Sequence, residues 1–75
     1  MENLTENILV FATNIKTEND KLKIRSTLDE HSEIDDWNID QEDIDCVLRI
    51  VSKSLTEEQI IKLIDKHDFE CVALE

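Results

Sequence analysis

The chain has 75 residues, and its 19 acidic and 8 basic side chains give a formal net charge of −11. A chain of this length folds as one domain with a small core, and we expect residues 1–75 to form it. Nucleic acids and anionic membranes attract basic surfaces, so this negative charge argues against both as partners. The chain contains no Gly and no Pro, and the lack of Gly excludes a glycine-rich phosphate loop.

The first third of the chain predicts a strand followed by a helix. Residues 7–15 are apolar and rich in strand formers, which is typical of a buried central strand. Thr17 and Asp20 have the spacing of a capping box, in which each residue bonds the backbone N–H of the other. Ile24 and Leu28, one helical turn apart, should then face the core.

Two further strands are predicted in the middle of the chain. Residues 37–40 alternate apolar and polar side chains, as a half-buried strand does. Residues 46–51 form a more apolar strand, and side chains alternate between its two faces. One face carries Cys46, Leu48 and Ile50, and the other carries Val47, Arg49 and Val51.

The last part of the chain predicts a second helix and a closing strand. Thr56 and Gln59 form another capping box, and Leu55 packs on Ile60 as a hydrophobic staple. A stripe at helical spacing follows, made by Ile60, Leu63, Ile64 and His67. Residues 70–74 make the last strand.

This order of elements predicts the fold. A βαββαβ chain of this length is the ferredoxin-like α+β sandwich. Right-handed crossovers place both helices on one face of a four-stranded, antiparallel-type sheet. The first and third strands, which are the most apolar, should be central.

The loop before the first helix resembles the M-x-C-x-x-C loop of heavy-metal-associated domains, the small copper-chaperone module. With Ile15 on the methionine of that motif, Thr17 and Asp20 fall on its two cysteines. Ile24 and Leu28 then fall on the family's two apolar helix positions. The resemblance implies a metallochaperone fold for the single domain.

The rest of the chain extends this resemblance. Residues 34–40 are similar to the family's G-V-x-x-V-x-V-D entry into the second strand, and residues 66–69 lie where it has A-G-Y or A-G-F. His67 and Asp68 replace the small residues that precede the aromatic. The likeness therefore covers nearly the whole chain, but not the cysteines that bind metal.

The two substituted loop positions decide between two hypotheses. Paired thiolates hold a soft ion such as Cu(I), whereas a threonine hydroxyl is a poor ligand and a carboxylate is a hard one. A capping box accounts for Thr17 and Asp20 without a metal. We therefore expect a binding or interaction domain with no cofactor and no metal ion. A metal-binding or metal-transfer protein that uses other ligands stays open as the alternative.

The cysteines and histidines predict no metal or disulfide site. Cys46 and Cys71 form no C-x-x-C pair, and in the predicted sheet the first strand separates them. We expect Cys46 to pack as a small hydrophobe and Cys71 to lie on an edge strand. His31 and His67 follow helices, where a cation suits the helix dipole. Since the first residues show no export signal, we expect free thiols in the cytosol.

The acidic middle of the chain suggests a calcium-binding loop, because oxygen-bearing side chains alternate over residues 36–42. An EF-hand loop needs Gly at its sixth position and Glu at its twelfth, where this chain has Gln41 and Val47. That excludes the calcium loop, while loose divalent-cation binding by clustered carboxylates stays open. No nucleophile-elbow or triad-like motif is present, so we expect no enzymatic activity.

Strand alternation predicts an interaction face instead. Arg49 would be costly inside a small core, so its side of the strand should face away from the helices. A candidate interaction face then gathers on the open side of the sheet, made by Ile8, Val10, Ala12, Val47 and Val51. Monomers rarely expose such a patch without a use, so we expect a protein partner, with self-association as one form. The alternative is that the long side chain of Arg49 covers this patch, so that no partner is needed.

Overall fold

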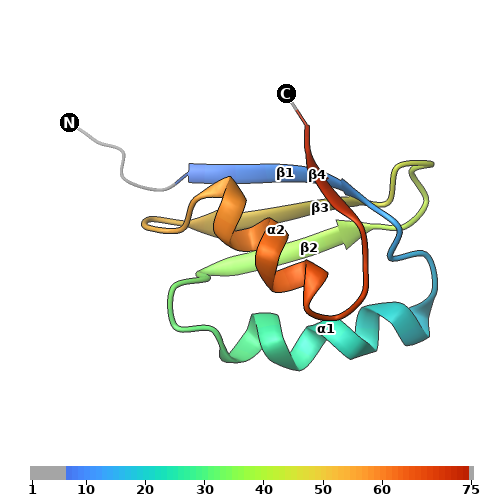
Figure 1. The fold of residues 1–75 in the computed structure, drawn as a ribbon, viewed down its shortest axis with the longest axis horizontal. Coiled ribbons are helices and arrows are strands. Elements are labelled where there is room, and N and C mark those ends of the chain that lie inside the picture. Colours follow the sequence, from blue (N-terminus) through green and yellow to red (C-terminus); the bar gives the residue numbers. More distant parts are fainter. Residues whose placement is uncertain (1–6, 75) are drawn as a thin grey trace.

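The computed structural model describes residues 7–74 (Figure 1). Four strands form one sheet in the order β2-β3-β1-β4, and every neighbouring pair is antiparallel. This confirms the predicted ferredoxin-like βαββαβ fold. The elements are β1 (Asn7–Thr13), α1 (Glu18–Glu30), β2 (Asp36–Asp40), β3 (Val47–Ser52), α2 (Glu57–Asp65) and β4 (Cys71–Ala73).

Both helices begin at the predicted capping boxes. The Thr17 hydroxyl accepts a hydrogen bond from the Asp20 amide at 3.0 Å, and the Asp20 carboxylate accepts one from the Thr17 amide at 3.3 Å. Thr56 and Gln59 exchange the same pair of bonds at the start of α2, at 3.2 and 2.9 Å. These bonds satisfy amides that the first turn of a helix leaves without partners.

The core lies between the sheet and the two helices. Its cluster joins residues of the central strands, the β1–α1 loop, both helices and the segments next to α2. Since both helices pack on this one side, the other side of the sheet carries no helix; we call it the open face. The cluster contains Phe11, Ile15, Ile24, Leu28, Leu48, Ile50, Leu55, Ile60, Ile64 and Phe69.

Most strand ends differ from the sequence prediction by one or two residues, and three boundaries change the position of a residue that the prediction singled out. β1 ends at Thr13 rather than at residue 15, and the Thr13 hydroxyl donates to the carbonyl of Cys46 at 2.7 Å. Cys46 has φ 45, a left-handed backbone, so it precedes β3 instead of starting it. α2 ends at Asp65, which leaves His67 in the following turn and not on the helix. A left-handed residue cannot continue a strand, and this places Cys46 outside the predicted alternation.

The turn after α2 contains the other left-handed residue of the described chain. Asp68 has a φ of 66° and lies where the sequence resemblance places a glycine of heavy-metal-associated domains. Aspartate tolerates this conformation better than most residues, because its short polar side chain can bond locally. The turn therefore forms without glycine, and Phe69 follows it into the core.

Candidate functional site

The β1–α1 loop is built as a helix cap. Ile15 is fully buried in the core cluster, which anchors the loop from below. Asp20 Oδ2 accepts hydrogen bonds from the amides of Lys16 and Thr17, at 3.2 and 3.3 Å. The Gln41 amide group donates to the Thr17 carbonyl at 2.8 Å and so ties the loop to the end of β2. Thr17 and Asp20 thus already have structural partners.

The charge of Asp20 is part of this cap. Desolvation alone would raise the pKa of its carboxyl, but hydrogen bonds with the backbone amides of Lys16 and Thr17 and with the Thr17 side chain, together with the nearby charge of Lys23, outweigh this effect and hold the pKa below its usual value. A carboxyl whose pKa is lower in the folded chain than in the unfolded chain stabilises the fold, and this stabilisation is fully present at pH values above the unfolded-state pKa. That contribution is lost as the pH falls through the folded pKa. At neutral pH the carboxylate is charged and engaged with the backbone.

The two cysteines do not form a joint site. They are free thiols carried by β4 and by the segment before β3, on either side of β1. Burial raises the pKa of the Cys71 thiol to about 12, so it stays protonated and weakly nucleophilic at neutral pH. Cys46 is buried, as predicted, although it lies outside the core cluster. Among residues 7–74, no three His, Cys, Asp or Glu side chains are grouped to hold a metal ion.

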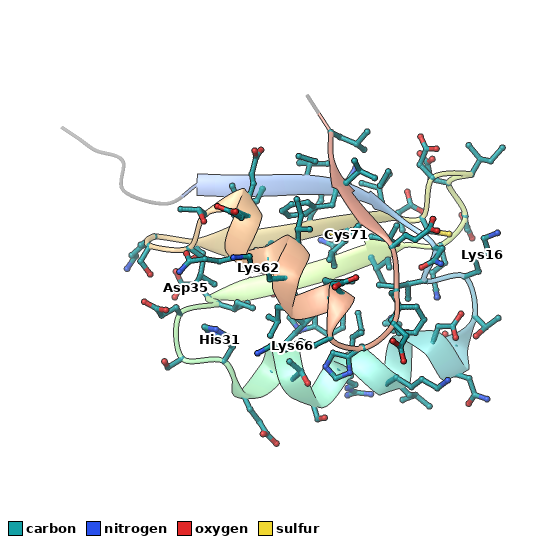
Figure 2. The ribbon with its side chains drawn as sticks, viewed as in Figure 1. Lys16, His31, Asp35, Lys62, Lys66 and Cys71 are labelled. Atoms are coloured by element: carbon teal, nitrogen blue, oxygen red, sulfur yellow. The ribbon has the colours of Figure 1, made fainter. Side chains whose placement is uncertain are left out.

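The histidines make contacts that tie loops and helices together. His67 Nε2 lies 3.0 Å from the Thr27 hydroxyl, which joins the turn after α2 to α1. His31 Nδ1 accepts the amide of Glu33 at 3.2 Å. His31 also borders a hollow of about 300 Å³ that is lined by Lys62 of α2 and by Lys66 just after it, and Figure 2 shows these three side chains near one another. Cations near the C-terminal end of α2 suit its dipole.

The oxygen-bearing side chains of residues 36–42 lie along and just after edge strand β2. Asp36, Asn38 and Asp40 are exposed and alternate with Trp37 and Ile39, which pack on the core. Asp36 Oδ1 accepts the amide of Trp37 at 2.9 Å, and Asp40 Oδ1 accepts the amide of Glu42 at 3.1 Å. Asp36 and Asp40 therefore lie on the side of β2 opposite Trp37 and Ile39, and their carboxylates bond amides of nearby residues.

The candidate interaction face lies where strand alternation places it. Leu9, Phe11, Leu48 and Ile50 pack in or on the core, so their neighbours in β1 and β3 point to the open face. Cross-strand register brings Ile8 opposite Val51 and Val10 opposite Arg49. Ile8 is 65% exposed, Val47 is buried, and the remaining three predicted members are half-buried: Val10, Ala12 and Val51.

The structure adds two residues that sequence reasoning did not place on this face. Val72 of β4 pairs with Ala12 and is 62% exposed, and Ile44, in the loop between β2 and β3, is 93% exposed. Both line a hollow of about 260 Å³ at one end of the open face. The rest of its lining comes from Ala12, Thr13, Asn14, Lys16, Asp45 and Glu70. The sequence predicts a strand that contains Val72, but only the order of strands in the sheet shows that Val72 pairs with Ala12.

A groove of about 420 Å³ lies between α1 and edge strand β2. Leu22, 52% exposed on α1, borders it beside Trp37, whose indole N–H donates to Asp29 Oδ1 at 2.7 Å. Its lining includes cationic residues, Lys21 and Arg25, and acidic residues, Asp35 and Asp36. The lining therefore favours no single class of ligand.

Comparison with solved structures identifies the fold. The chain superposes on the apo form of the HMA domain of the copper chaperone for superoxide dismutase with a TM-score of 0.81 and 17% identity, over 95% of this chain and 69% of that one. The copper(I)-loaded first domain of the human copper chaperone for SOD1 gives a TM-score of 0.78 and 17% identity, over 93% and 94% of the two chains. The fold is that of a heavy-metal-associated domain. No protein-family model and no curated protein sequence matches the chain.

Because the fold matches that of copper-binding domains, we asked whether the side chains of the β1–α1 loop fit a copper(I) ion. The positions that the sequence resemblance sets on the two family cysteines carry the Thr17 hydroxyl and the Asp20 carboxylate, both oxygen donors. Soft Cu(I) prefers thiolate and thioether ligands, and Asp20 Oδ2 already accepts two backbone amides. The residues present at this loop do not fit a copper(I) ion.

Within the described residues, neither helix is long and apolar enough to cross a membrane.

Proposed function

We propose that this chain is a non-enzymatic protein-docking domain, which uses a metallochaperone fold without a bound metal ion and docks its partner on the open face. The observation that carries the proposal is the aliphatic band on that face, made by Ile8, Val10, Ala12, Val47, Val51 and Val72, of which Val47 is buried. Its members come from three neighbouring strands, and the most exposed of them are Ile8 and Val72. A chain of net charge −11 is well solvated without aliphatic side chains on its surface. The exposed band therefore indicates a binding surface rather than a solubilising one.

Docking through this face predicts how variants behave in a cross-linking experiment. The tagged chain is incubated with an extract of cells that express it, cross-linked, and its contacts are mapped by mass spectrometry. We expect contacts next to the aliphatic band and their loss in Val10→Lys, because a buried, unpaired ammonium opposes apolar docking.

The matched control for Val10→Lys is Lys62→Ala, which changes an exposed residue on α2 and should keep the contacts. Contacts that mapped to residues 17–20, with the open face untouched, would show that the docking surface was wrongly placed.

A second candidate function, metal binding or transfer, is favoured by the likeness to copper chaperone domains. The two candidates differ in copper(I) affinity. We expect the wild-type chain, under reducing conditions, to compete with a Cu(I) chelator no better than a thiol-containing peptide of equal concentration. The physical reason is that both side chains at the loop offer oxygen rather than sulfur ligands, and both oxygens already accept hydrogen bonds in the helix cap.

The control for this titration restores the ligands. Thr17→Cys combined with Asp20→Cys puts two thiols on the loop, with Ile15 still buried beneath it. We expect the double variant to bind one Cu(I) per chain and to be less stable than the wild type, because the capping box is lost. One tight, stoichiometric site in the wild type would favour the metal function instead.

A further inference from the structure

The open face has a charge pattern as well as an aliphatic band. Edge strand β2 borders the band with Asp36 and Asp40, both exposed. Beside Val72 of β4, on the side of the sheet away from β2, the end hollow is lined by Asp45 and Glu70. Carboxylates therefore border the aliphatic band on two sides.

Two cations also belong to this surface. Arg49 lies within the band, between Val10 on β1 and Asn38 on β2, and is exposed. Lys16 lines the end hollow and lies at the opposite end of the molecule from Asp35 and His31 (Figure 2). Four carboxylates against two cations leave the border of the face negative, in keeping with the net charge of the chain.

From this pattern we infer that the open face docks a partner protein whose aliphatic surface is bordered by lysine or arginine side chains. The inference rests on the proposed docking function and adds the chemistry of the partner. Charge complementarity at the rim of an interface steers association and rejects like-charged surfaces. The end hollow suits a long basic side chain, because its stem can cover Ile44 and Val72 while its head reaches Asp45 or Glu70.

The same pattern opposes a second copy of this chain as the occupant. A face-to-face pair would bring two negatively bordered faces together, each on a chain of net charge −11. Like-charge repulsion of this kind disfavours association unless salt screens it. A basic partner removes the repulsion and gains ion pairs at the rim.

The test uses two matched probes of known composition. One is a disulfide-closed β-hairpin peptide with valine and isoleucine on one face and four lysines at its border; the other replaces those lysines with glutamates. Each is titrated into the ¹⁵N-labelled chain, and amide chemical shifts give both the affinity and the contact surface. We expect the lysine hairpin to shift open-face amides with a Kd at least about tenfold lower than that of the glutamate hairpin at low salt. About 1 M salt should remove most of this preference.

Two charge-neutralised variants localise the effect. Asp36→Asn with Asp40→Asn keeps the acceptor oxygens that bond the backbone, and should reduce the preference for lysine several-fold. Glu57→Gln with Glu58→Gln changes the net charge equally, but on exposed positions of α2, and should leave the preference intact. A preference reduced equally by both pairs would mean that only net charge acts, which would overturn the inference.

The remaining outcomes separate the partner chemistry from the docking function. Equal affinities for the two hairpins at the open face would overturn the basic-partner inference while leaving the docking function in place. Shifts confined to the helices would overturn both. A wild-type chain that sediments as a dimer dissociated by Val10→Lys would assign the face to a second copy and overturn the inference.

Discussion

Ile64→Ala is expected to lower the free energy of unfolding by about 2–5 kcal/mol. Ile64 is 0% exposed and lies in the core cluster between α2 and the sheet. The substitution removes apolar contacts and leaves a cavity that a small, close-packed core fills poorly. Small domains unfold at a cost of only about 5–15 kcal/mol, so this single change removes a large share of the stability.

Urea denaturation followed by Trp37 fluorescence measures this loss. Trp37 is the only tryptophan, and its indole joins β2 to α1 through Asp29, so its emission should report the separation of these elements. If Ile64→Ala is too unstable to give a folded baseline, Ile64→Val should give a smaller loss of about 0.5–1.5 kcal/mol.

The control for Ile64 lies on the outer side of the same helix. Lys62 has a side chain 74% exposed, and its ammonium is 3.9 Å from the carboxylate of Glu58. An exposed pair of this kind contributes about 0.3–0.5 kcal/mol, so Lys62→Ala should be nearly silent. A larger loss for Lys62→Ala than for Ile64→Ala would contradict the orientation of α2.

Ser52→Ala is expected to lower the free energy of unfolding by about 1–3 kcal/mol. Ser52 is 0% exposed, and its hydroxyl donates to the Glu33 carbonyl at 2.7 Å. The same oxygen accepts the amides of Ser54 at 3.2 Å and of Leu55 at 3.0 Å. One hydroxyl thus satisfies three backbone groups, and alanine would leave the buried Leu55 amide without this partner.

Ser54 supplies the matched control for Ser52. Its hydroxyl donates to Glu33 Oε2 at 2.9 Å, but both groups are exposed and water can replace the bond. Ser54→Ala should therefore change stability by less than about 0.5 kcal/mol. The same urea titration compares the two variants, and equal losses would argue against the buried role of the Ser52 hydroxyl.

The amino-acid sequence by itself determined the features that depend on local spacing. Both capping boxes and the buried pair Ile60 and Ile64 follow from residues three or four positions apart, whose contacts a helix fixes by its own geometry. Alternation along β1 and β3 placed Arg49 and Val10 on one side of the sheet for the same reason. Together with the order of elements, these local rules predicted the fold.

Only the tertiary structure decided the contacts between distant segments. The exposure of Ile44 and Val72 beside Ala12 depends on sheet order and loop path, and neither is encoded in the spacing of neighbours. The left-handed backbone of Cys46, whose carbonyl accepts the Thr13 hydroxyl, ended the predicted alternation there. Ser52 lies just beyond the strand predicted over residues 46–51, and only folding brings the carbonyl of Glu33 to its hydroxyl. Such contacts join groups far apart in the chain, so they form only when the elements have packed.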